Sequence, residues 1–306
     1  MKISDAIKQT GHSLSFEFFP PKTKADENRL FGVACRLESF FPTFVSVTYG
    51  AGGGTSKTTR EVVKRIHEET SLTLMPHLTC IGQVEDELRG ILRDYREMGV
   101  ENILALRGDP PQGMVITPGH NGRCHARNLI EIVKSFNVFS IGVAVYPEGH
   151  SESPSLEKDI AYTKEKIDAG ADFAITQMFF DNRYFYQFME RAEQAGIRIP
   201  VIPGIMPVTD IEKIKRFSGL CGATLPKDLI VRMERATSKQ DEVKIGINFA
   251  IEQCQDLIEN GVRYLHFYTL NNADIVSEIL RGLNLDAGSL SQSDTESAGD
   301  LIAFAD

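Results

Sequence analysis

Short apolar runs alternate along this chain with longer stretches in which apolar residues recur every three or four positions. The short runs predict β-strands, and the longer stretches predict amphipathic helices. In the first long stretch, for example, Leu30, Val33 and Leu37 share one helical face. The predicted strands are residues 13–19, 44–49, 73–79, 102–106, 140–145, 173–176, 200–203 and 264–268, and the predicted helical stretches are 25–41, 58–70, 85–98, 126–136, 156–169, 184–195, 209–259 and 273–283.

Eight strand–helix units in alternation predict an α/β fold of the (β/α)8, or TIM-barrel, type, formed by a single domain over residues 1–286. A doubly wound open sheet is the alternative. The glycine-rich turn at residues 50–54 does not support it, because Thr55 stands where the G-x-G-x-x-G motif has its last glycine. The turn is equally consistent with a flexible loop and with a backbone that a ligand approaches closely. Residues 287–306 are rich in Ser, Asp and Gly, which predicts a disordered tail.

The composition is typical of a soluble enzyme, with 42% hydrophobic and 25% charged residues. No apolar run is long enough to cross a bilayer and the N-terminus lacks an apolar signal core, so we expect a cytoplasmic protein without a membrane partner. The formal net charge of −9 argues against nucleic-acid binding. The five cysteines are scattered and no H-E-x-x-H motif occurs, so neither a disulfide framework nor a metal site is predicted.

One carboxylate stands out because it lies in an apolar strand. In the strand at 13–19, Phe16 and Phe18 share one face, Glu17 is on the other, and Pro20 ends the strand. Burial disfavours the charged form, so we expect a raised pKa for Glu17, as a proton donor near neutral pH requires. The alternative is a structural glutamate that pairs with a lysine or arginine of the core.

Polar residues also stand at the ends of most other predicted strands. In (β/α)8 barrels the carboxyl ends of the strands form the active site, so we expect these side chains on one rim. Together they predict a site that orients a large polar ligand around one or two carboxylates. His266 differs, because it lies inside an apolar strand and is predicted to be a hydrogen-bonded core residue. The strand-end residues are Glu17, Thr48, His77, Arg107, Asp109, Tyr146, His150, Gln177 and Tyr268.

Eight motifs, in order along the first 285 residues, resemble the bacterial-type methylenetetrahydrofolate reductase family. The resemblance implies an FAD-containing barrel that reduces methylenetetrahydrofolate to methyltetrahydrofolate, with NADH or NADPH as reductant. It implies a ping-pong course in which the folate and the nicotinamide nucleotide use one face of the flavin in turn, and it suggests a homo-oligomer. The motifs occupy residues 15–23, 46–53, 76–80, 106–111, 146–150, 174–177, 203–207 and 266–271.

The resemblance also implies roles for individual residues. Glu17 matches the general acid that protonates the folate, and Asp109 matches an aspartate whose charge favours a cationic iminium and affects the flavin potential. Arg107 and Lys166 would neutralise the flavin pyrophosphate. The matching substrate-binding positions are Glu17, Thr48, Gln177, Phe217 and Tyr268. The matching flavin-binding positions are Thr48, Tyr49, Ala51, His77, Arg107, Gly108, Asp109, His125, Ala126, Tyr146, His150, Asp159 and Lys166.

Some positions depart from the family pattern. His125 replaces a tyrosine that lies against the flavin, and Asn272 replaces an arginine that reaches the folate. Tyr162 and Glu165 replace polar or basic residues on the flavin-side helix. Two other functional classes remain open: a different flavin barrel, such as a proline dehydrogenase-like enzyme, and a non-enzymatic folate- or flavin-binding subunit that depends on a partner for electrons.

Overall fold

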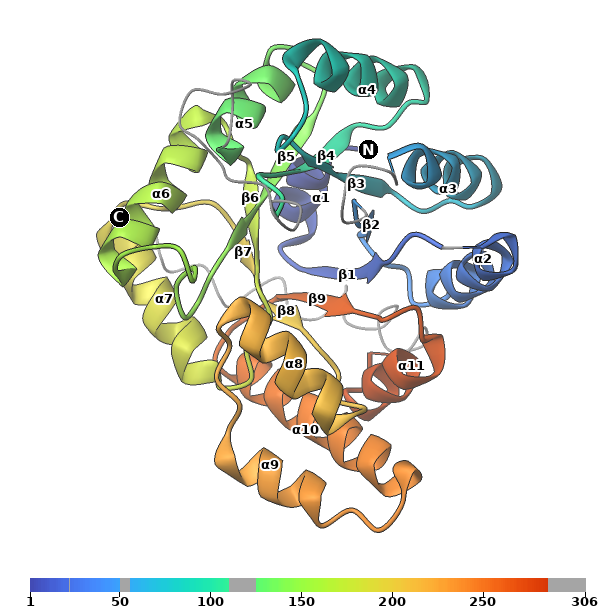
Figure 1. Ribbon diagram of the computed structural model, residues 1–306, viewed down its shortest axis with the longest axis vertical. Helices are drawn as coiled ribbons and strands as arrows, with labels where there is room; N and C mark the ends of the chain where they lie inside the picture. The colour runs from blue at the N-terminus through green and yellow to red at the C-terminus, as the bar shows by residue number, and fades with distance from the viewer. Residues whose placement is uncertain (22, 50–55, 110–124, 286–306) are drawn as a thin grey trace.

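Parallel strands form the centre of the molecule, and helices surround them (Figure 1). The computed structural model describes residues 1–21, 23–49, 56–109 and 125–285. The strands pair in the order β7-β6-β5-β4-β3-β2-β1-β9-β8, and each pair is parallel. Their bounds are β1 (Ser13–Phe18), β2 (Phe44–Val47), β3 (Leu74–Thr79), β4 (Asn102–Leu106), β5 (Ser140–Val145), β6 (Phe173–Thr176), β7 (Val201–Ile202), β8 (Gly204–Ile205) and β9 (Tyr264–Tyr268).

The sheet closes at the seventh predicted strand, which confirms a (β/α)8 barrel in one domain. That strand, predicted as one segment, is divided into β7, which pairs with β6, and β8, which pairs with β9. Pro203 separates the two halves because it has no N–H to donate, while its carbonyl accepts the N–H of His266 at 3.0 Å. The N–H of Gly204 then bonds the Thr176 hydroxyl at 2.9 Å rather than a strand carbonyl.

Most predicted helices agree with the observed ones to within a few residues. The stretch 209–259 is the exception, because it contains three helices instead of one helical region. Gly222, with a φ of 78°, ends the first of them, Pro226 precedes the second, and the Ser238 hydroxyl caps the third. The helices are α1 (Ile3–Thr10), α2 (Lys24–Glu38), α3 (Ser56–Glu69), α4 (Glu85–Glu97), α5 (Ala126–Lys134), α6 (Leu156–Ala169), α7 (Asn182–Gln194), α8 (Ile211–Cys221), α9 (Lys227–Glu234), α10 (Lys239–Glu259) and α11 (Ala273–Gly282).

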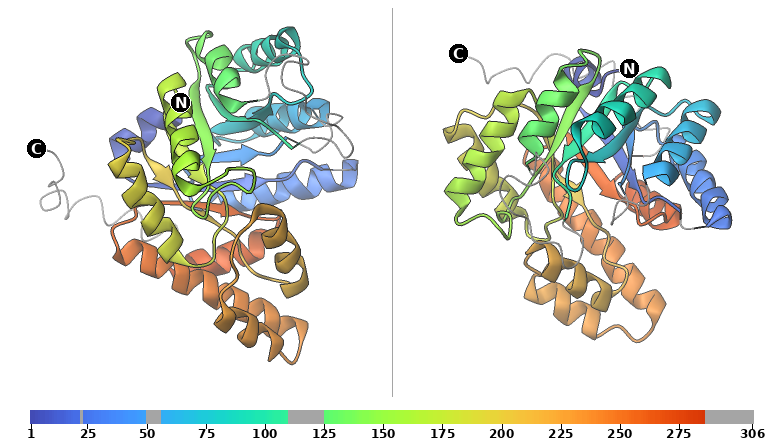
Figure 2. Two further views of the ribbon diagram at one scale, coloured as in Figure 1. Left: turned by 60° about the vertical axis from the view of Figure 1, so that its left-hand side comes forward. Right: turned by 45° about the horizontal axis from the view of Figure 1, so that its top comes forward.

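Two features of the helix layer matter for the site. α9 and the adjoining end of α10 extend away from the barrel (Figure 2). α1, which the sequence analysis did not predict, closes the amino-terminal end of the barrel: Ile3 and Ile7 are buried in one cluster with inward-facing strand residues such as Phe44 and Phe173. The Asn102 side chain holds the start of this helix by accepting the N–H of Ile3 at 2.8 Å. The interior at the amino-terminal end of the barrel is therefore filled mainly by apolar side chains.

The alternation predicted for the first strand is confirmed. Leu14, Phe16 and Phe18 belong to the core between strands and helices, and the residues between them face the barrel interior. Gly142 also faces inward, where an added Cβ would lie 2.9 Å from the Phe173 ring, so its lack of a side chain makes room for that ring. Among the helices that the structure describes, none has both the length and the apolar character needed to span a membrane.

Candidate active site

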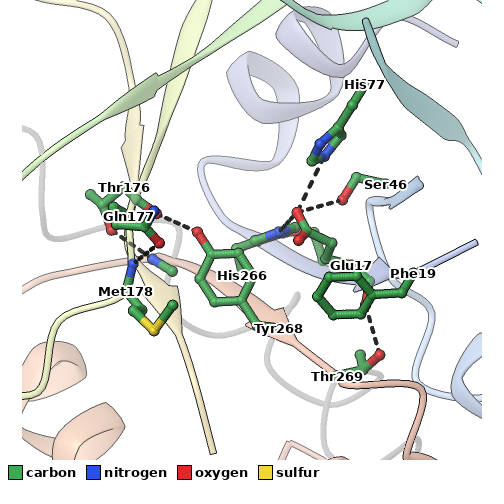
Figure 3. Close-up of polar contacts among 12 residues, drawn as sticks. Glu17, Phe19, Ser46, His77, Thr176, Gln177, Met178, His266, Tyr268 and Thr269 are labelled. Carbon is green, nitrogen blue, oxygen red and sulfur yellow. Dashed lines mark hydrogen bonds and ion pairs between the residues drawn. The ribbon is translucent and has the colours of Figure 1, made fainter. Parts of the chain in front are cut away.

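A buried carboxylate lies at the carboxyl-terminal end of β1 (Figure 3). The Glu17 residue is 6% exposed, and its Oε2 atom is 3.2 Å from His77 Nε2 and 3.5 Å from His266 Nε2. Oε2 also accepts a long hydrogen bond of 3.4 Å from the Ser46 hydroxyl. β1 lies between β2 and β9, and its register places Glu17 opposite both Ser46 and Tyr268. Barrel closure thus gathers these groups from four strands.

The prediction of a raised pKa for Glu17 is wrong. Burial does raise it, but the charges and contacts of His77 and His266 outweigh burial and lower the pKa to about 2. The sequence argument weighed the neighbouring phenylalanines, which face the helices, and missed the histidines that arrive from β3 and β9. The alternative of a lysine or arginine partner does not hold either, since both ionic partners in the described structure are histidines.

The two histidine contacts are ion pairs more than hydrogen bonds. Neither Nε2 atom meets hydrogen-bond geometry within the described part of the chain, although both are within ion-pair distance of the carboxylate. His266 is fully buried, and its Nδ1 is 2.9 Å from the Ser15 hydroxyl, which confirms a hydrogen-bonded core histidine. The low pKa of Glu17 therefore depends on the positive charge of these rings. Loss of the His77 contact would weaken the influence that lowers the pKa of Glu17.

Tyr268 connects the Glu17 side of the rim to β6. Its hydroxyl donates to the Thr176 carbonyl at 2.6 Å, and its ring packs edge-on against His266, 5.4 Å between ring centroids. Burial is the main cause that raises the pKa of Tyr268 well above its usual value, so this hydroxyl stays protonated. Gln177 follows the last residue of β6, and its Oε1 accepts the N–H of Met178 at 2.9 Å (Figure 3). Gln177 and Tyr268 consequently lie on the same rim as Glu17.

A second polar group lies at the ends of β4 and β5 and on α6. The Arg107 guanidinium forms a two-pronged contact with Glu152, a residue that the sequence analysis did not select. The Tyr146 ring meets His150 edge-on at 4.6 Å, and the Lys166 ammonium lies 5.9 Å from the centroid of the same tyrosine ring. This group presents two cations and an aromatic ring close together.

Lys166 is a half-buried cation with little compensation. Its ammonium donates to the Ala144 carbonyl at 2.6 Å. Burial lowers the pKa of Lys166 to about 8, and Asp159 opposes that shift. The Asp159 carboxylate in turn accepts the Ser153 hydroxyl at 2.7 Å and the N–H of His150 at 3.2 Å. An anionic ligand group at this point would restore the charge balance that burial disturbs.

The remaining predicted positions border these two groups. Asp109 is exposed just beyond β4, and Thr48 and Tyr49 follow β2. Gly108 has a φ of 84°, and an added Cβ would lie 2.8 Å from Ile81, so only glycine suits this turn. Ala51 and the predicted tail lie outside the described residues.

Four further positions lie on helices or at their starts. His125 is the N-cap of α5 and Ala126 is its first residue. The Cys80 sulfur lies 3.7 Å from the His125 and Arg107 carbonyls, which brings the ends of β3 and β4 close to this helix start. Phe217, on α8, packs in an apolar cluster that also contacts Tyr268. Asn272, one of the departures, caps α11 by accepting the N–H of Asp274 at 3.1 Å.

Ser46, Glu152 and the contact between His266 and Glu17 were missed. Ser46 and His266 each stand two positions before a selected strand-end residue, so the two-residue period of a strand could have placed them in the barrel interior. Glu152 had no such signal, because it lies in a loop. Among the residues that the structure describes, no group of three or more His, Cys, Asp or Glu is arranged to hold a metal ion.

Comparison with known proteins agrees with the motifs. The methylenetetrahydrofolate reductase family model matches residues 2–284. The 5,10-methylenetetrahydrofolate reductase of Salmonella typhimurium is 40% identical over 277 residues, which are 90% of this chain and 92% of that protein. The Escherichia coli protein of the same name is 39% identical over the same shares. Methylenetetrahydrofolate reductase (NADH) 1 of Arabidopsis thaliana is 37% identical over 96% of this chain, but only 52% of the plant protein is covered.

A solved structure shares the fold at low identity. It is described as an uncharacterized protein from Clostridium thermocellum that binds two copies of 5-methyl-5,6,7,8-tetrahydrofolic acid. Its TM-score is 0.62 at 12% identity, and the match covers 92% of this chain and 98% of that one. The matched family model and the bacterial relatives each cover most of this chain, so the chain belongs to the methylenetetrahydrofolate reductase family.

Proposed function

We propose that this protein reduces 5,10-methylenetetrahydrofolate to 5-methyltetrahydrofolate with FAD and with NADH or NADPH, and so feeds one-carbon metabolism and methionine synthesis. The observation that carries the proposal is the buried Glu17 carboxylate at the barrel rim, between His77 and His266. The names of the bacterial relatives support the same reaction, and one plant relative is named for NADH. The structural neighbour that binds 5-methyltetrahydrofolic acid supports a folate ligand for a barrel of this kind.

The second polar group suits FAD. A dinucleotide carries a negative pyrophosphate and flat rings, and this group offers Arg107, Lys166 and the Tyr146 ring within one cluster. Arg107 already forms a hydrogen bond with Glu152. A bound phosphate would either replace the Glu152 carboxylate as the partner of Arg107 or share the guanidinium with it. The half-buried ammonium of Lys166, with its one hydrogen bond to a carbonyl, matches an anionic partner. Bound FAD would supply the hydride-transfer chemistry of both half-reactions.

We assign to Glu17 the proton that folate reduction needs. Opening the folate ring at its methylene bridge requires a proton on a weakly basic nitrogen and leaves a cationic iminium. A pKa of about 2 does not suit a donor while both histidines hold the carboxylate. A folate that separates both histidines from Glu17 would remove the influences that oppose burial and would raise the pKa of Glu17. Asp109 would favour the cation electrostatically, and Gln177, Phe217, Thr48 and Tyr268 would contact the substrates.

The visible spectrum of the purified protein tests this proposal. We expect a yellow protein with non-covalent FAD that bleaches when NADH or NADPH is added without oxygen. Subsequent addition of methylenetetrahydrofolate should restore the yellow colour. A protein that stays colourless with added FAD would contradict the flavin assignment. A flavin that neither nucleotide reduces would instead indicate a binding subunit that depends on a partner for electrons.

A further inference from the structure

His266 is a fully buried titratable residue beside Glu17, and its side chain is 0% exposed. The pairing of β1 with β9 places His266 opposite Ser15, two residues before Glu17 on β1. Phe44, a member of the apolar cluster that fills the amino-terminal end of the barrel, stacks on this ring with 5.9 Å between centroids. His266 therefore lies between that cluster and the Glu17 carboxylate (Figure 3).

The two ring nitrogens of His266 have different partners. Nδ1 is 2.9 Å from the Ser15 hydroxyl oxygen, and Nε2 is 3.5 Å from Glu17 Oε2. The Ser15 hydroxyl donates its own proton to the Leu265 carbonyl at 3.2 Å, so its oxygen is left to accept a hydrogen bond from a protonated Nδ1. Because Nδ1 keeps its proton in this arrangement, Nε2, on the side of the carboxylate, is the nitrogen that can gain or lose one.

Glu17 needs a source of protons if it is to act as an acid. Burial raises its pKa, but His77 and His266 lower it to about 2, so the side chain is ionised at neutral pH in the free protein. Bound folate would cover the rim and exclude water, which makes delivery of a proton from solvent slow at the moment when it is needed. A cation that is already inside the barrel removes this difficulty.

We propose that His266 stores the proton that Glu17 gives to folate, and that Ser15 is a positioning residue that keeps this store charged. The inference rests on the proposed folate reduction and extends it to the origin of the proton. In the transfer, the Nε2–H bond of His266 breaks and an O–H bond forms at Glu17 Oε2. The products are a neutral acid and a neutral imidazole that retains its Nδ1 proton. Burial penalises both charges of the ion pair, so exclusion of the remaining water favours the neutral pair.

The remaining steps return the pair to its starting state. Once neutral, Glu17 is no longer held to the histidines by its charge and can turn toward the substrate. It protonates the folate nitrogen, whose bond to the methylene carbon breaks and leaves its electron pair on that nitrogen. When the site opens, water returns one proton to the pair, so each folate turnover consumes one proton from solvent. The separation of 3.5 Å has to shorten for the transfer, and catalytic hydrogen bonds that are long in free enzymes commonly tighten when substrate binds.

Nitrogen-15 NMR of the full chain with labelled histidines tests whether His266 is charged. The chain has seven histidines, and the signals that disappear in His266→Gln identify this one. At neutral pH we expect both nitrogens of His266 to be protonated in the parent protein. Ser15→Ala removes the acceptor of the Nδ1 proton, so we expect a neutral ring that is protonated at Nε2 alone.

Ser13→Ala is the matched control for Ser15→Ala. Ser13 is a buried serine on the same face of β1, and its hydroxyl has no hydrogen-bond partner among the described residues. This variant loses the same hydroxyl group without touching His266. We therefore expect His266 to remain protonated at both nitrogens in Ser13→Ala.

Stopped-flow kinetics of the FAD-loaded protein test whether the stored proton is used. His266→Gln and Ser15→Ala should keep the parent rate of flavin reduction by NADH or NADPH, because that half-reaction takes no proton from Glu17. Reoxidation by methylenetetrahydrofolate should slow by about tenfold in both variants. This loss is smaller than the ~100-fold expected for removal of the acid itself, because solvent can still protonate Glu17 before folate binds. Ser13→Ala should have the parent rate in both half-reactions.

Three results would overturn the proposed proton store: a neutral His266 in the parent protein, unchanged reoxidation in both variants, or equal slowing of both half-reactions. Equal slowing would show a distorted site instead of a missing proton. All three leave the proposed folate reduction intact. Reduced flavin that methylenetetrahydrofolate does not reoxidise in the parent protein would overturn that function, and the store with it. Ser15→Ala removes a single hydroxyl, so it still provides the test if His266→Gln does not fold.

Discussion

At the scale of single residues, the balance between burial and charge decides how Glu17 behaves. Burial alone would favour the neutral acid, whereas His77 and His266 favour the carboxylate. The two influences are of opposite sign, so weakening the histidine contacts raises the pKa of Glu17. A strand-end carboxylate in this setting is held charged in the free protein and is ready to gain a proton when its neighbours change.

The lowered pKa of Glu17 predicts a loss of stability in acid. The folded-state pKa of Glu17, about 2, is below the ordinary value of 4.5. The contribution of this carboxylate to the free energy of unfolding is therefore complete above about pH 4.5 and disappears as the pH falls toward 2. The shift corresponds to roughly 3 kcal/mol at most. Chemical unfolding between pH 5 and pH 2.5 should therefore show a steeper loss for the parent protein than for Glu17→Gln. An equal decrease in the free energy of unfolding of the two proteins over this pH range would contradict this account of the ion pairs.

Lys166 predicts a pH dependence of FAD binding. Its pKa of about 8 means that the ammonium loses its proton as the pH rises through 8, and with it the attraction for a phosphate. We expect the FAD dissociation constant, measured by flavin fluorescence, to rise several-fold from pH 7 to pH 9.5. Lys166→Met should bind FAD more weakly and show a flat profile over this range. A flat profile in the parent protein would remove Lys166 from the phosphate site.

The position of Glu17 followed from the sequence, but its electrostatics did not. The two-residue period of a strand was sufficient to place this side chain in the barrel interior, opposite Phe16 and Phe18. The identity of its ionic partners depends on which strands become neighbours and in what register, and local pattern does not contain that information. The bond between Arg107 and Glu152 was missed for a similar reason, because a loop carries no periodicity from which a contact could be inferred.

At the scale of elements, the alternation of strands and helices was predictable, and the exceptions occur where tertiary contacts override local signals. Pro203, which has no N–H to donate, divides the seventh strand at the point where the barrel closes, with one neighbour pairing before the proline and the other after it. The three-helix segment α8–α10 had turn signals at Gly222 and Pro226, which the long helical periodicity obscured. α1 carries Ile3 and Ile7 at helical spacing, but it is a short segment whose stability depends on the barrel that it closes.

This closing helix gives a prediction about stability. Ile7 is 1% exposed inside the barrel cluster, so Ile7→Ala should lower the free energy of unfolding by about 2–4 kcal/mol in urea titrations. Lys8→Ala, at the neighbouring exposed position of α1, is the matched control and should change stability by no more than about 0.5 kcal/mol. Equal effects of the two substitutions would show that α1 does not seal the barrel.

At the scale of the whole molecule, the apolar residues that close the barrel and the polar residues of the candidate site lie at opposite ends of it. α1 and the apolar cluster around Phe44 and Phe173 fill the amino-terminal end, and the Glu17 group and the Arg107–Lys166 group both lie toward the carboxyl-terminal end. One rim can thus hold a carboxylate for proton transfer beside a cationic group for a dinucleotide. The central claim is that Glu17 serves the folate half-reaction alone, since hydride transfer from a nicotinamide to a flavin requires positioning and no proton from this residue.

Stopped-flow measurement of the two half-reactions in Glu17→Gln tests that claim most directly. Glutamine preserves the size of the side chain but has no acidic proton to give. We predict that the variant keeps bound FAD and its reduction by NADH or NADPH, while reoxidation by methylenetetrahydrofolate slows by at least ~100-fold. Equal slowing of both half-reactions with FAD still bound, or normal rates in both, would contradict the account.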